Sequence, residues 1–174
     1  MNRLYVMLLG SCALAAQTAN PLSNELRVSY TTIKTNLLKM ADKMPGDRYL
    51  FKPVPEIETF GRRVAHIADA NYRTCAGLKE ERKSLGAASK TAKPDLVAAI
   101  KESFAYCDGV FESLTDATAV EMVAGAIGSP PVPGQMRTRL STLWNVVRHS
   151  NEMYGYMSVY LRLNGVVPPS SAPD

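Results

Sequence analysis

Histidine and cysteine, the side chains that most often bind metals or act as nucleophiles, are scarce in this sequence. Its 174 residues include 2 histidines and 3 cysteines. The sequence has no Cys-x-x-Cys pair, no Gly-x-Ser-x-Gly nucleophile motif and no glycine-rich phosphate-binding loop. Catalysis by a serine, cysteine or aspartate nucleophile therefore has no motif to support it.

The charge pattern gives no sign of a nucleic-acid-binding face. The net charge of +4 arises from 20 basic and 16 acidic residues that are spread along the chain. The densest basic stretch, 79–93, also contains Glu80 and Glu81, and no basic helix face with interleaved aromatics accompanies it. We interpret this stretch as a solvated loop and expect no nucleic-acid partner.

Long apolar runs are also missing, and the one apolar N-terminal stretch predicts a signal peptide over residues 1–20. Arg3 supplies a basic start, the apolar run 4–9 follows, and Ala13-Leu14-Ala15 is a small-x-small cleavage pattern. The run is too short for a transmembrane helix, so we expect export to the periplasm or secretion and no transmembrane segment. An alternative is a lipoprotein, because Leu9-Gly10-Ser11-Cys12 resembles a lipobox in which Cys12 is lipidated.

Apolar residues recur at helical spacings along four segments, which predicts four helices. The first runs from about Ser23, a candidate N-cap, to Lys43, and the turn at 45–47 ends it. The second begins at Pro55-Glu56, because proline suits the first turn of a helix, and ends at Leu78. Its apolar stripe comprises Ile57, Phe60, Val64, Ile67, Asn71, Cys75 and Leu78.

The second half of the chain supplies two more helices. The third opens at Pro94-Asp95 and continues through Leu114, and the fourth spans about Met136 to Asn164. Gly165, followed by two prolines, is a stop signal. We expect residues 79–93 and 115–134 to form loops, and the first of them is long enough to let the third helix run parallel to the second.

These segments predict an all-α fold, a four-helix bundle without a sheet. No segment shows the sustained alternation of a strand with hairpin turns. The expected organisation is a signal peptide over 1–20, one bundle domain over 21–171 and a tail over 172–174. Bundles of this kind hold metals in the core between facing helices.

The two histidines, His66 and His149, fall near the middle of the second and fourth expected helices. Both can point inward at similar depth. A lone inward histidine is more often a hydrogen-bonded core residue than a metal ligand, so the spacing leaves both interpretations open.

Three stretches of the chain carry a family resemblance: FGRRVAHIADANYRTC over 60–75, SFAYCD over 103–108 and HSNEMYGYMSVYLRLNGVVPPSS over 149–171. Together they resemble the DinB-like family of four-helix metalloenzymes. The resemblance implies an up-down-down-up bundle. It also implies a divalent metal such as zinc or nickel, bound by one histidine on the second helix and a His-x-x-x-His pair on the fourth. Some relatives are thiol-dependent transferases or hydrolases, and the family tends to form homodimers.

Carried over to this chain, the resemblance assigns His66 and His149 as metal ligands and places Met153 in the third ligand position. A thioether is a soft, neutral ligand that suits copper(I) and binds zinc or nickel poorly. Glu152 or Asp69 is a candidate replacement ligand. The resulting hypothesis is an exported DinB-like protein with a degenerate metal site, a binding or vestigial member whose small-molecule ligand is unknown. The alternative is a divalent-metal-dependent hydrolase or thiol transferase that uses both histidines.

Cys75 and Cys107 form a second candidate pair. Both fall on core stripes of helices that are neighbours in such a bundle, and an exported protein meets an oxidising compartment. We therefore expect a disulfide. The alternatives are a nucleophilic thiol close to the metal, or two reduced cysteines that pack as small apolar residues.

Overall fold

The protein is described by a computed structural model that places residues 19–124 and 136–172. The expected signal peptide up to residue 18, Cys12 and the Gly128–Gly134 loop lie outside these described residues. The elements follow one another as α1 (Pro21–Lys43), η1 (Gly46–Arg48), α2 (Phe60–Leu78), η2 (Ala87–Ser89), α3 (Lys93–Glu112), α4 (Asp116–Ala119), β1 (Met122–Ala124), β2 (Met136–Thr138), α5 (Arg139–Leu163) and η3 (Pro169–Ser171).

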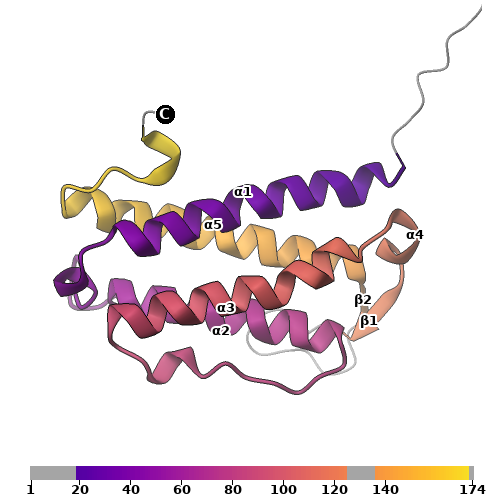
Figure 1. Ribbon diagram of the computed structural model, residues 1–174, viewed down its shortest axis with the longest axis horizontal. Coiled ribbons are helices and arrows are strands. Elements are labelled where there is room, and N and C mark those ends of the chain that lie inside the picture. The colour runs from indigo at the N-terminus through magenta and orange to yellow at the C-terminus, as the bar shows by residue number, and fades with distance from the viewer. Residues whose placement is uncertain (1–18, 125–135, 173–174) are drawn as a thin grey trace, which may run out of the picture.

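The four long helices form a bundle in which α1 and α5 run alongside each other above α2 and α3 (Figure 1). Contacts between α2 and α3 advance along both helices in the same direction: Ser103 Oγ donates to the Ala68 carbonyl over 2.7 Å, and Cys75 meets Cys107 further along. The two helices are therefore parallel, and the long crossover between them is confirmed. The all-α, up-down-down-up fold is confirmed with it.

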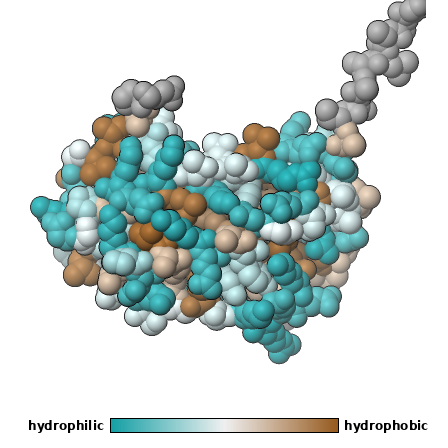
Figure 2. Space-filling view, in the orientation of Figure 1, coloured by the Kyte–Doolittle hydropathy of each residue, from teal (hydrophilic) through white to brown (hydrophobic). Residues whose placement is uncertain are grey.

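The core lies between the two layers and is built from the predicted stripes. Tyr30 of α1 stacks on Phe111 of α3 with ring centroids 3.7 Å apart, and the Tyr30 hydroxyl donates to the Phe104 carbonyl. The largest fully buried side chains are Tyr49, Phe60, Phe104, Phe111, Leu37, Met40, Met44, Ile67, Leu96, Ile100, Leu114 and Leu143. The face shown in Figure 2 is mainly hydrophilic, with hydrophobic side chains in separate patches.

The predicted starts of α2, α1 and α5 are wrong, and a capping side chain explains the first. Helix α2 begins at Phe60 because the Thr59 hydroxyl accepts a hydrogen bond from the Arg62 amide, 3.2 Å away, and satisfies a free N–H of the first turn. Residues 55–57 instead form a turn before it. Helix α1 begins at Pro21, so Ser23 lies inside the helix, where its hydroxyl donates to Asp116 over 2.7 Å.

The expectation of no sheet is also wrong. Strands β1 and β2 pair antiparallel, with Val123 opposite Arg137. Helix α5 begins directly afterwards at Arg139, capped by Thr138, and not at the predicted Met136, which lies in β2. Each strand has three residues, which is too short for an alternating pattern to stand out. The expected loop 115–134 accordingly includes α4 and β1.

The stop signal after the last helix is confirmed. Gly165 adopts a left-handed φ of 71°, and the Val166 amide donates back to the Leu161 carbonyl over 2.9 Å. This is the pattern by which glycine closes a helix C-terminus. Within residues 19–124 and 136–172, no helix is both long and apolar enough to span a membrane.

Candidate functional site

His66 lies on the edge of α2 that turns toward α5. Its neighbours Val64, Ile67 and Ala68 are fully buried, whereas the imidazole itself is exposed. His149 projects from α5, which Thr138 caps and which runs antiparallel to α2, and it is partly buried. The expectation that both histidines point inward at similar depth is therefore wrong: the pair lies at the rim of the interface between the two helices.

The two imidazoles meet directly. The Nε2 atoms of His66 and His149 are 3.0 Å apart, and the rings lie with their centroids 4.9 Å apart at an angle of 65°. At this distance one Nε2–H donates to the other Nε2, so the two rings adopt opposite tautomers. The alternative is that both nitrogens direct lone pairs at one shared cation.

Electrostatics hold both rings in the neutral form that metal binding and hydrogen-bond acceptance require. The side of the His66 ring that packs against the bundle is shielded from water, which lowers the pKa of His66 below its usual 6.5, and Arg63 lowers this pKa further. Burial also lowers the pKa of His149, and His66 itself is the next cause. Both shifts favour the uncharged imidazole near neutral pH.

Arginines surround the histidine pair on the α2 side. Arg62 and Arg63 precede His66 by four and three residues and Arg73 follows it by seven, spacings that place each of them close to the side of α2 that carries His66. The guanidinium of Arg63 lies 5.8 Å from the Tyr156 ring centroid, and its buried Nε has no hydrogen-bond partner in the described part of the chain. A buried donor without a partner, one helical turn from His66, favours an acceptor-rich ligand.

Met153, the third residue assigned by resemblance, lies one helical turn beyond His149 and is 5% exposed. Its position puts it on the same face of α5 as His149, one turn along the helix. The third position is thus occupied by a buried thioether, deeper in the bundle than either imidazole.

Neither candidate carboxylate replaces that thioether. The carboxylate of Asp69 accepts hydrogen bonds from the amides of Ala87 and Ala88, at 2.8 and 2.9 Å, and so anchors η2 of the crossover. Glu152 is exposed and pairs with Arg148 over 3.6 Å. Across the described residues, no group of three or more His, Cys, Asp or Glu side chains is arranged to hold a metal ion.

The structure joins Cys75 of α2 and Cys107 of α3 in a disulfide with a Cα–Cα distance of 5.4 Å, as expected from their stripes. Both residues are fully buried. A thiol nucleophile is thereby absent from these two positions in the oxidised protein.

Sequence reasoning missed a polar contact between α2 and α5, in which the buried Asn71 amide donates to Ser150 Oγ over 3.3 Å.

Comparison with known proteins identifies the family. The sequence model of the DinB superfamily matches residues 30–157. The chain belongs to the DinB superfamily. The match covers both histidines and Met153, and it confirms the resemblance drawn from the sequence.

Solved DinB-like structures share the fold. A DinB-like protein from Bacillus cereus ATCC 10987 superposes with a TM-score of 0.70 at 18% identity, covering 84% of this chain and 95% of that one. A DinB-like protein from Bacillus subtilis gives 0.62 at 18% identity, covering 82% and 93%. A conserved protein from Enterococcus faecalis gives 0.55 at 13% identity, covering 80% and 97%. No curated protein matches the chain.

The residues of this DinB bundle fit the divalent metal implied by the family in part. Two nitrogens that bind one tetrahedral zinc at about 2.0–2.1 Å lie about 3.3 Å apart, so the 3.0 Å pair needs to open by about 0.3 Å. The third donor does not fit, because a thioether is a poor ligand for zinc or nickel. Two imidazoles alone do not make a firm catalytic site, which uses three protein ligands.

Proposed function

We propose that this DinB-superfamily chain is an exported binding protein whose metal site is degenerate. The observation that carries the proposal is the meeting of His66 and His149 at 3.0 Å with Met153 in the third position. The arrangement keeps two ligands of a family metal site and replaces the third with a side chain that binds divalent ions poorly. The pair then serves as a hydrogen-bonding centre.

The groups around the pair support a small anionic ligand. In the hydrogen-bonded pair the ring that accepts at Nε2 carries its proton on Nδ1, and Arg63 adds a buried donor that lacks a partner in the described structure. Arginine binds carboxylates and phosphates through paired, charge-assisted hydrogen bonds. We infer that a carboxylate or phosphate bound at this edge of α2 would accept hydrogen bonds from the Arg63 guanidinium.

A metal-dependent hydrolase or thiol transferase is the second candidate function. It is favoured by the short Nε2 separation, which lies within about 0.3 Å of the spacing that a shared tetrahedral ion needs. In that case His66 and His149 hold the ion, and an external thiol supplies the nucleophile, because Cys75 and Cys107 are bonded to each other.

Export is supported by the N-terminal sequence and is consistent with the disulfide. The basic start and small-x-small pattern of residues 1–20 are typical of a signal peptide, and disulfides persist in oxidising compartments. A lipoprotein attached through Cys12 remains the alternative form of the exported protein.

Native mass spectrometry of the exported protein tests both parts of the proposal in one spectrum. We expect a mature chain that has lost roughly the first 15 to 20 residues. We also expect no zinc or nickel adduct after dialysis, because two imidazoles release a divalent ion readily. The control is the His66→Ala variant, which should give the same metal-free spectrum.

Two results would contradict the proposal. Retention of Met1 in the exported fraction would refute the signal peptide, and a diacylglyceryl adduct at Cys12 would favour the lipoprotein. Near one equivalent of zinc or nickel in the wild type, lost in His66→Ala, would refute the degenerate site and support the metalloenzyme.

A further inference from the structure

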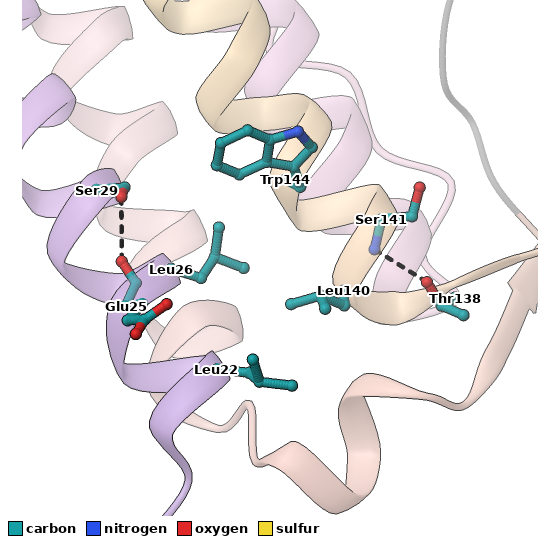
Figure 3. Close-up of a pocket in the computed structure, with 8 residues that line it drawn as sticks. All are labelled: Leu22, Glu25, Leu26, Ser29, Thr138, Leu140, Ser141 and Trp144. Carbon is teal, nitrogen blue, oxygen red and sulfur yellow. Dashed lines mark hydrogen bonds between the residues drawn. The ribbon is translucent and has the colours of Figure 1, made fainter.

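A groove separate from the histidine pair opens between the first turns of α1 and α5 (Figure 3). The histidines lie between α2 and α5, whereas the groove lies at the start of the parallel α1 and α5. Its volume is about 540 Å³, within the range of about 300–1,000 Å³ that is typical of small-molecule sites. A ligand of moderate size therefore has room here.

The walls of the groove are mainly apolar. Leu22 and Leu26 of α1 point toward Leu140 of α5, and the Trp144 indole extends from α5 toward α1 (Figure 3). The Trp144 side chain is 53% exposed, and no aromatic or cation–π contact among the described residues covers its ring. The groove thus offers an apolar floor and a free aromatic face.

Among the described residues, Glu25 contributes the one charged side chain of the lining. It follows Leu22 by three residues and precedes Ser29 by four, so all three share a face of α1. Within residues 19–124 and 136–172 its carboxylate has no ion pair and no hydrogen bond. A free carboxylate across the groove from an exposed indole is a combination that can recognise an organic cation, through charge and through the ring quadrupole (Figure 3).

The N-terminal ends of α1 and α5 carry partial positive charge that would repel a cation in the groove, but side-chain oxygens already accept hydrogen bonds from their free N–H groups. An uncapped helix start carries roughly half a positive charge. The Asp116 carboxylate accepts hydrogen bonds from the Leu22 and Ser23 amides, and the Thr138 hydroxyl accepts one from the Ser141 amide. Because Asp116 brings a full negative charge to the α1 end, the balance around the groove favours a cation.

We propose that this groove binds an organic cation with an apolar body, such as a quaternary ammonium compound or a protonated alkylamine. The apolar body lies on Leu22, Leu26 and Leu140. The ammonium group lies between the Trp144 face and the Glu25 carboxylate. This groove shares no residue with the histidine pair, so the proposal does not depend on whether the metal site is degenerate.

The test uses the fluorescence of Trp144, which is the single tryptophan of the chain. The probes are hexyltrimethylammonium chloride and 1-octanol, an uncharged compound of similar length, each titrated into the mature protein. We expect a saturable change with the cation at about tenfold lower concentration than with the alcohol. Glu25→Gln should weaken cation binding about fivefold and leave octanol binding unchanged.

Calorimetry on Trp144→Leu completes the test, since that variant keeps an apolar wall and removes the aromatic face. We expect it to lose most of the preference for the cation and to retain octanol binding. Equal affinities of the two probes in the wild type, or an unaltered preference in both variants, would overturn the proposal. A fluorescence change that tracks protein concentration, with dimers in sedimentation, would also overturn it by assigning the groove to a second copy.

Discussion

Met153→His should raise the affinity for zinc and nickel by orders of magnitude. Residues 149 and 153 lie one turn apart on α5, which is the spacing that lets two imidazoles bind one ion. With His66 Nε2 already 3.0 Å from His149 Nε2, the new side chain would complete a three-histidine site with an open fourth position. Titration calorimetry with each metal measures the gain. Thermal stability should become metal-dependent, because the ion binds the folded state.

Two matched variants separate ligation from repacking. Met153→Leu conserves volume without adding a nitrogen, so its metal affinity should equal that of the wild type. His66→Ala in the Met153→His background should abolish most of the gain. Without metal, Met153→His should be less stable by about 1 to 3 kcal/mol, because an imidazole buried at a 5% exposed position lacks partners. Equal metal affinity in Met153→His and the wild type would mean that the three positions do not converge on one ion.

Loss of the Cys75–Cys107 disulfide should destabilise the mature protein by about 3 to 4 kcal/mol. The bond joins residues 32 apart in sequence. In the chain-entropy model, closing a loop of that size lowers the conformational entropy of the unfolded chain and so raises the free energy of unfolding by this amount. Urea unfolding with and without reductant measures the difference. The effect is a large part of the stability of a single domain, which is typically about 5–15 kcal/mol.

The double variant Cys75→Ala/Cys107→Ala is the control for reduction. Its free energy of unfolding should equal that of the reduced wild type, apart from the cost of the small cavities that the substitutions leave. Reductant should not change its unfolding curve. Thiol counting on unreduced, denatured mature protein gives a direct answer. Two reactive thiols at Cys75 and Cys107 would refute the disulfide.

Helical periodicity predicted the four long helices and the parallel crossover, because each helix buries one stripe. The ends of the helices depended on contacts that periodicity does not register. Thr59 caps α2 four residues after Pro55. Asp116 lies 93 residues beyond Ser23 in the sequence, and its carboxylate accepts a hydrogen bond from the Ser23 amide at the start of α1. The pairing of β1 with β2 brings together residues from either side of the segment 125–135, which no local pattern in three-residue strands indicates.

The candidate site was predictable in its members and not in its depth. Family resemblance brought His66, His149 and Met153 together, yet a one-dimensional pattern does not show that His66 lies at the rim while Met153 is buried. The role of Asp69 followed from the path of the crossover, which returns η2 to the side of α2. The groove at Trp144 forms only because α1 packs parallel to α5, and no motif in either helix predicts it.

A crystal structure of the mature, oxidised protein, purified without chelators and measured at the zinc and nickel absorption edges, tests the central claim most directly. The account predicts facing Nε2 atoms of His66 and His149 near their 3.0 Å separation, Met153 in the third position and no anomalous peak between the imidazoles. A fully occupied anomalous peak bonded to both histidines and to a third protein ligand would contradict it.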